Sequence, residues 1–144
     1  MSKRAWVNSC WSRVRMVILI IGFLCMSSVT LAENLINKGR DRYYNDCAAC
    51  HGEAARGKGS VSEVLTVPPS DLTQLTRDNR GQFPEDYVRR VVDGRNLPPV
   101  AHGETRMPIW GNHYRQTETG TSEQNVARNI DELIAYLRSV QAEQ

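Results

Sequence analysis

The sequence predicts a small all-α domain, and three observations lead to that fold class. Three segments repeat apolar residues three and four positions apart, which is the spacing of one face of a helix. No segment shows the sustained alternation of apolar and polar residues that indicates a strand. The chain has 144 residues, which is enough for one domain. We therefore expect the helices to share a single core.

The first 32 residues are expected to be a signal peptide that precedes this domain. Their front carries four cations and no acidic residue: Lys3, Arg4, Arg13 and Arg15. An almost wholly apolar run over 16–26 follows, and small neutral residues then lead to Ala32. That order is typical of an export signal. We predict cleavage after Ala32, a mature domain over 33–144 and a periplasmic location.

An uncleaved membrane anchor is the alternative for this leader. The stretch from Val14 to Ala32 has 19 residues, just enough to span a bilayer, but its last third is small and polar. Four of the 18 Lys+Arg and none of the 16 Asp+Glu lie in the leader, so the mature chain has a formal charge of −2. No basic tract indicates nucleic acid. Contact with a membrane is expected only if the leader is retained.

The first helix is predicted over Glu33–Asp46, with Leu35, Ile36, Gly39 and Tyr43 on its buried face. The second is predicted to follow Phe83-Pro84, because a proline followed by two acidic residues favours a helix start. Gly94 is expected to end it. Its expected buried residues are Tyr87, Val88, Val91 and Val92.

The third helix is predicted over Ser122–Val140, with Ser122 as its cap and Glu123 favouring its N-terminal dipole. Its expected apolar stripe is Val126, Ile130, Leu133, Ile134 and Leu137. Long loops are expected over 52–82 and 95–121, and loops of that length are usually functional or wrapped around something. The part over 112–121 suggests no role.

The stretch from Cys47 to His51 reads CAACH and contains the only cysteines of the mature chain. A redox dithiol of the thioredoxin kind needs a preceding strand, and a disulfide here would close only a tiny loop. A zinc site needs four ligands, and the spacing of His102 and His113 is not usual for zinc. Cys-x-x-Cys-His is the signature of covalent haem attachment. We predict one haem c, held through Cys47 and Cys50, with His51 on the iron.

Met107, in RMPIWG, is the only methionine left after the leader. It lies in a loop bounded by proline and glycine, outside any apolar stripe, so filling the core explains it poorly. We predict that its thioether is the second axial ligand, which leaves no open position for oxygen or peroxide. His102 and His113 are the alternatives, and ligation by His102 would give a low-potential bis-histidine protein.

These motifs together resemble the monohaem, class I c-type cytochromes over residues 33–142. The resemblance rests on five stretches in this order: GRDRYYNDCAACHG (39–52), VPPSDLTQL (67–75), FPEDYVRRVVDGR (83–95), MPIWG (107–111) and IDELIAYLRSV (130–140). It implies helices wrapped around the haem, with the two end helices in contact.

The resemblance also implies roles for single residues. Gly39 would let Tyr136 of the last helix pack closely. A carbonyl at Pro68 or Pro69 would accept a hydrogen bond from His51 Nδ1. Further candidates for contact with the haem or its propionates are Trp110, Arg77 and Arg95.

The predicted function is electron transfer between redox partner proteins, without enzymatic activity. The family's mitochondrial members dock through a ring of lysines, but the mature chain keeps only Lys38 and Lys58. Docking is therefore expected at an apolar patch around the exposed haem edge, where the two cysteine thioethers lie. We expect the protein to be a monomer that forms transient complexes. One alternative is a haem c subunit of a larger oxidoreductase or respiratory complex. A haem peroxidase or sensor is the other, and Met107 argues against it.

Overall fold

The structure is a computed structural model that describes residues 30–96, 107–116 and 122–142. The chain divides into two compact units, Met1–Asn34 and Leu35–Gln144. The predicted leader lies almost wholly outside the described residues. Among those residues, no helix is both long and apolar enough to cross a membrane.

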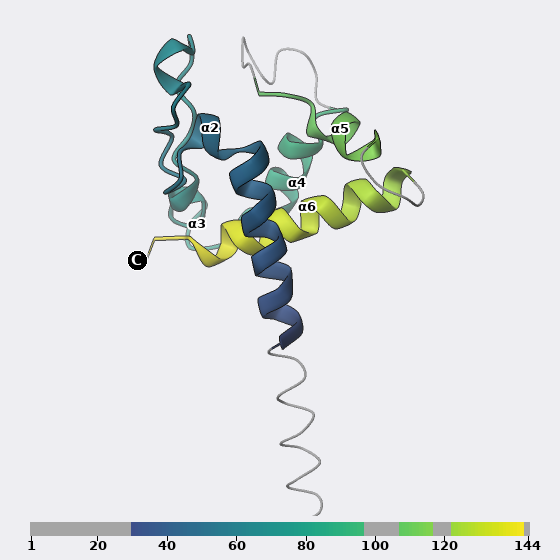
Figure 1. Cartoon of the computed structure of the whole chain (residues 1–144). Coiled ribbons are helices and arrows are strands. Elements are labelled where there is room, and N and C mark those ends of the chain that lie inside the picture. The colour runs from purple at the N-terminus through teal and green to yellow at the C-terminus, as the bar shows by residue number, and fades with distance from the viewer. Residues whose placement is uncertain (1–29, 97–106, 117–121, 143–144) are drawn as a thin grey trace, which may run out of the picture. The chain divides into compact units, whose positions relative to one another are not determined.

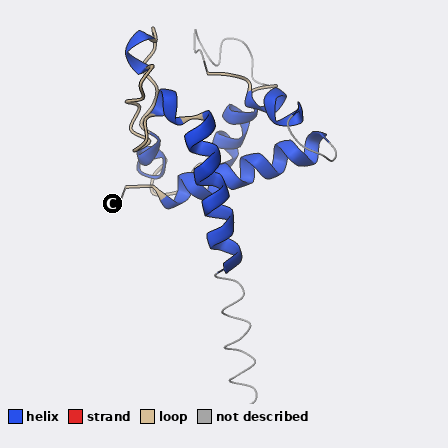
Figure 2. Cartoon of the chain, viewed as in Figure 1, coloured by secondary structure: helices blue, strands red, loops and turns tan. Residues whose placement is uncertain are grey.

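The second unit is all-α over its described residues, as the sequence predicted (Figures 1 and 2). It begins with residues 35–46 of a helix that covers 30–46, which we call the first helix. Its other elements are α2 (Ala48–His51), η1 (Ser62–Val64), η2 (Leu72–Gln74), α3 (Leu75–Asp78), α4 (Glu85–Asp93), α5 (Trp110–Gln116) and α6 (Ser122–Ser139).

The first helix crosses α6 at Gly39 (Figure 1). A Cβ atom on Gly39 would lie 1.8 Å from the backbone oxygen of Glu132 and 2.9 Å from Cβ of Tyr136. The expected close packing of Gly39 and Tyr136 is therefore confirmed. The expected burial of Leu35 is wrong: this residue lies one turn before the crossing and is 40 % exposed.

The central element of the core is α6. All five residues of its predicted stripe are buried, together with Asn125, Asn129 and Glu132. Burial extends beyond one stripe because the first helix, α4 and α5 all pack against this helix. The stripe alone therefore underestimated how much of α6 is covered.

The predicted start and stop of α4 are confirmed. The helix begins at Glu85, and Gly94 ends it in the left-handed conformation, with φ of 68°. Val88 and Val92 are buried, but Tyr87 is 57 % exposed, so its expected burial is wrong. Residues 88 and 92 are four apart and share one face, whereas Tyr87 points about 100° away from Val88.

The two expected loops contain helices that the apolar pattern did not predict. The stretch 52–82 holds η1, η2 and α3, and α5 covers 110–116. The segment 112–121 was expected to be a loop without a role, but its first part is helical. It buries Tyr114, which is 1 % exposed. Trp110 and Tyr114 lie four residues apart and stack, with ring centroids 5.9 Å apart, so this aromatic pair was the available signal for a helix.

Candidate functional site

The CAACH stretch forms the junction between the first helix and α2. Cys47 precedes α2, and its carbonyl accepts hydrogen bonds from Cys50 N at 3.1 Å and from His51 N at 2.9 Å. These bonds fold the motif into one helical turn. The turn therefore presents two thiols and one imidazole from adjacent positions of a short rigid element.

The thiols do not resemble a reactive redox pair. They are not bonded to each other, Cys47 is buried and Cys50 is half-buried. Burial, reinforced by the nearby carboxylate of Asp46, raises the pKa of Cys47 to about 12. Reactive cysteines instead have a lowered pKa. Among the described residues, no three His, Cys, Asp or Glu side chains lie close enough together to hold a metal ion.

The imidazole of His51 is held in one tautomer. Its Nδ1 lies 3.0 Å from the backbone oxygen of Ser70. A carbonyl oxygen can only accept, so Nδ1 carries the proton and Nε2 keeps its lone pair. Burial lowers the pKa of His51, although the bond to Ser70 opposes this shift. The neutral ring with a free Nε2 is the form that binds a metal.

The predicted acceptor for His51 is corrected by one residue. The carbonyl belongs to Ser70, whereas Pro68 or Pro69 was expected. The Pro69 carbonyl faces Gly57 instead, since a Cβ atom on Gly57 would lie 2.2 Å from that oxygen. Pro69 therefore shapes the loop next to the acceptor. The choice between neighbouring carbonyls depends on the path of the loop, which the residue types do not specify.

Backbone contacts hold this loop against α2. Gly57 N donates to His51 O at 2.8 Å, and Gly59 N donates to Cys50 O at 3.0 Å. A Cβ atom on Gly59 would lie 2.1 Å from Ala49 O, so only glycine allows the approach. Gly57 has a φ of 75°, a conformation that other residues rarely adopt. The glycines therefore position both the motif and the Ser70 carbonyl.

The other predicted ligands have different surroundings. Met107 is half-buried and packs against the hydrophobic core, as does Trp110 at the start of α5. His113 is exposed, and it contacts Trp110 edge to face, with centroids 5.5 Å apart. His102 lies outside the described residues.

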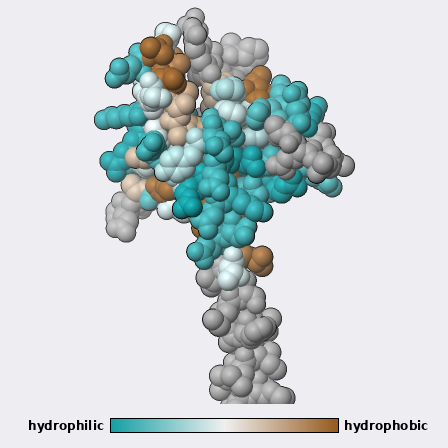
Figure 3. Space-filling model, viewed as in Figure 1, coloured by the Kyte–Doolittle hydropathy of each residue, from teal (hydrophilic) through white to brown (hydrophobic). Residues whose placement is uncertain are grey.

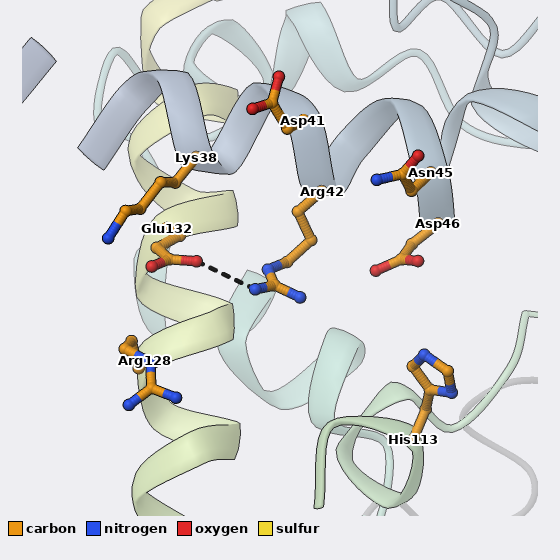
Figure 4. Close-up of a pocket in the computed structure, with 8 residues that line it drawn as sticks. All are labelled: Lys38, Asp41, Arg42, Asn45, Asp46, His113, Arg128 and Glu132. Carbon is orange, nitrogen blue, oxygen red and sulfur yellow. Dashed lines mark hydrogen bonds and ion pairs between the residues drawn. The ribbon is translucent and has the colours of Figure 1, made fainter. Parts of the chain in front are cut away.

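His113 also lines an open polar cavity of about 400 Å³ between the first helix, α5 and α6 (Figure 4). The cavity contains cationic and acidic side chains together, and the ion pair between Arg42 and Glu132, at 3.1 Å, crosses it. Tyr114 donates to Asp46 Oδ2 at 3.0 Å. This bond ties α5 to the residue directly before Cys47. Tyr114 is therefore a supporting residue that the sequence analysis missed.

Both arginines proposed for the propionates have carboxylate partners. Arg77 is exposed and pairs with the adjacent Asp78 at 3.0 Å. Arg95 pairs with Asp93 and with Glu123, and these bonds raise the pKa of Arg95. A propionate would have to compete with these partners, so contact of either arginine with a propionate stays a prediction.

The donor set fits a covalently bound haem. Each thiol can add to a vinyl group, and the neutral imidazole on the same turn has a free Nε2 for iron. The Ser70 carbonyl fixes the other ring nitrogen, as a carbonyl behind a metal-binding histidine commonly does.

Comparison with known proteins supports this fit. The sequence profile of the family described as Cytochrome c matches residues 36–141, which is more than half of the chain. No curated protein and no solved structure gave a match. The family implies covalently bound haem c and electron transfer, generally without enzymatic activity. The chain belongs to the cytochrome c family.

Proposed function

We propose that the protein is a periplasmic electron carrier with a single haem c, attached through Cys47 and Cys50 and ligated by His51 and Met107. The observation that carries this proposal is the hydrogen bond that His51 Nδ1 donates to Ser70 O. His51 lies on the same helical turn as both thiols. The bond to Ser70 orients the ring and leaves Nε2 available, while burial of His51 favours the neutral form by lowering its pKa.

The residues of the chain would each have a defined task. The bound haem would supply the one-electron couple between Fe(III) and Fe(II). His51 would hold the iron from one side, and Ser70 would fix the orientation of its ring. Met107 would supply a neutral sulfur on the other side, which raises the reduction potential and occupies the position that a peroxidase keeps open.

Partner docking is proposed at the exposed apolar loop that carries η1, seen at the upper left of Figure 3. Val61 N donates to Ala49 O at 3.0 Å, so the loop adjoins the residue before Cys50. Val64 is 82 % exposed and Val67 is 49 % exposed. Val64→Glu should slow electron transfer to an apolar-faced partner without changing the haem spectrum. Unchanged transfer rates would exclude this surface.

The ligands can be tested on protein produced with the haem-attachment machinery. Methionine sulfur on ferric haem gives a weak charge-transfer band in the red, and Met107→Ala should abolish it. His113→Ala is the matched control and should keep the band. A wild-type protein without the band, or with a bis-histidine spectrum, would exclude Met107 and favour His102.

Carrier and enzyme can be separated on the same samples. The wild-type protein should neither bind carbon monoxide nor react with peroxide, because the sixth position is occupied. Met107→Ala should bind carbon monoxide. Rapid binding by the wild-type protein would favour the peroxidase or sensor alternative.

A further inference from the structure

The residues that follow Met107 are fastened to the end of α4. Gly111, in the first turn of α5, lies so close to Asp93 that a Cβ atom would stand 1.9 Å from Asp93 Oδ1 and 2.7 Å from its backbone oxygen. A Cβ atom on Gly94 would lie 3.3 Å from Cγ2 of Ile109. Because Ile109 and Gly111 lie two and four residues after Met107, these contacts limit where its side chain can lie.

Arg95 holds this junction together through two forked ion pairs. Its Nε and Nη2 donate to the two oxygens of Asp93, the second bond measuring 3.1 Å. Its Nη1 and Nη2 donate to the two oxygens of Glu123, at 2.8 Å and 2.9 Å. We call Arg95 with these two carboxylates the Arg95 fork.

The Arg95 fork joins three helices at one point. Asp93 is the last residue of α4, and Glu123 lies in the first turn of α6. Arg115 of α5 also pairs with Glu123, and Arg95 Nε would lie 2.7 Å from a Cβ atom on Gly111. The side chains of Arg95 and Asp93 are only 17 % and 23 % exposed, so solvent screens this pair less than a surface pair.

We infer that the Arg95 fork is a positioning device for Met107, which keeps the thioether in place for the iron. The inference rests on the proposed ligation by Met107. A thioether is neutral and a weak ligand, so its occupancy depends on how far the chain restricts it beforehand. Loss of the fork frees Ile109 and Gly111 from α4 and lets other ligands displace the sulfur.

The same two helices provide a matched control at their opposite ends. Arg138 near the end of α6 pairs with Glu85 at the start of α4. This pair also joins α4 to α6, but at the ends of both helices that lie away from Asp93 and Glu123. Arg138→Met therefore reports the cost of losing an α4–α6 ion pair without disturbing the Arg95 fork.

The test is a titration of the ferric holoprotein with imidazole, which displaces a methionine ligand and abolishes its red band. Arg95→Met should lower the imidazole concentration at half-displacement by about tenfold, given the strength of forked charge-assisted bonds. Glu123→Gln keeps the fork to Asp93 and should lower it about threefold. Arg95→Lys should restore little, because an ammonium cannot hold two carboxylates bidentately.

Each outcome decides between a positioning role and general stabilisation. The inference requires Arg138→Met to bind imidazole like the wild type, even where it loses as much unfolding free energy as Arg95→Met. If Arg138→Met and Arg95→Met promote displacement equally, the effect is global and the inference is wrong.

The inference is also overturned if Met107→Ala abolishes the red band but neither Arg95→Met nor Glu123→Gln changes its displacement by imidazole. Ligation by Met107 would then stand. A wild-type protein without the band overturns both proposals. If Arg95→Met does not fold, Glu123→Gln decides, because its substituted side chain is 60 % exposed.

Discussion

His51 owes its tautomer to a backbone atom, so no side-chain substitution removes that control directly. The acceptor is the carbonyl of Ser70, and its place is set by the tight contact between Gly57 and Pro69. The electron-donating strength of the imidazole therefore depends on the geometry of the loop that carries Gly57, Gly59 and Ser70. A change in Gly57 should reach the iron through this route.

Gly57→Ala tests that route. The new Cβ atom would collide with Pro69 O and would hold an alanine at a φ of 75°. We expect a loss of about 1–3 kcal/mol in unfolding free energy and a higher reduction potential. The potential should rise because a weaker bond from Nδ1 makes His51 a poorer donor to ferric iron. Redox titration and denaturant unfolding measure the two effects.

Gly81→Ala is the control, because Gly81 is exposed and has a similar φ of 83°. It should lose stability through backbone strain alone and keep the wild-type potential. A raised reduction potential in both variants would show that backbone strain anywhere in the stretch 52–82 is enough to change the potential. The specific link from Pro69 and Ser70 to His51 would then be wrong.

Glu123 gives the protein a predictable response to acid. Its bonds to Arg95, and then to Arg115, lower the pKa of Glu123 from 4.5 to about 2. A carboxylate with a depressed pKa stabilises the fold fully above its unfolded value and loses that contribution as the pH falls through its folded value. The difference in unfolding free energy between wild type and Glu123→Gln should therefore be constant above pH 5. It should shrink toward pH 2. A constant difference down to pH 2 would contradict the pairing.

Single functional residues differed in how far the sequence revealed them. Cys47, Cys50 and His51 could be proposed from the sequence because the chemistry expected of them depends on a fixed local spacing. Ser70 could not, because its contribution is a carbonyl that every residue has. Tyr114 was missed for a related reason: its value lies in reaching Asp46, and that distance exists only after the helices have packed.

Among the elements, the crossing of the first helix and α6 depends most on one residue. Gly39→Ala would place a Cβ atom 1.8 Å from Glu132 O, a backbone atom that can move only with its helix. We expect a loss of about 1–3 kcal/mol in unfolding free energy, although alanine favours helices more than glycine. Thermal or urea unfolding of the holoprotein measures it.

Asn37→Ala is the control for intrinsic helix propensity, since Asn37 is exposed on the same helix. It should be neutral or slightly stabilising. A Gly39→Ala protein as stable as this control would mean that the two helices separate at little cost. The close crossing would then be a minor contribution to the fold.

The sequence predicted burial well at the centre of an apolar stripe, and poorly at its margins and where no stripe is present. The stripe of α6 was correct because its residues meet a continuous core. Tyr87 and Leu35 lie at the margins of their stripes, and only the partner helix decides whether a margin is covered. The helix α5 has the sequence WGNHYRQ, in which polar residues and a glycine conceal the helical period.

At the scale of the whole molecule, the division at residue 34 leads to a test of the proposed leader. We expect the exported protein to begin at Glu33 and to carry the mass of one haem. Residues 33–144 behind a foreign export signal should give the same spectrum and the same unfolding midpoint. Intact mass spectrometry checks the first expectation, and unfolding followed by haem absorbance checks the second.

A retained leader would be seen as a heavier chain in the membrane fraction. That result would favour the anchored form and make a complex subunit the better description. Loss of haem from the 33–144 protein would instead mean that the N-terminal unit is needed for assembly. Replacing Ala32 by a bulky residue is a useful control, because it should block processing without changing the domain.

The crossing at Gly39 also orders events in time. It joins segments separated by about ninety residues, and closing a loop of that length costs roughly 4 kcal/mol in chain entropy. A chain made from its N-terminus cannot form this contact until its last helix has emerged. Until then Cys47 lies on an open polypeptide, whereas in the finished fold its side chain is buried. Because the attachment site that we propose at Cys47 is accessible only before the domain folds, we expect the haem to be attached to the unfolded chain. A variant that folds faster should then leave a larger fraction of molecules without haem.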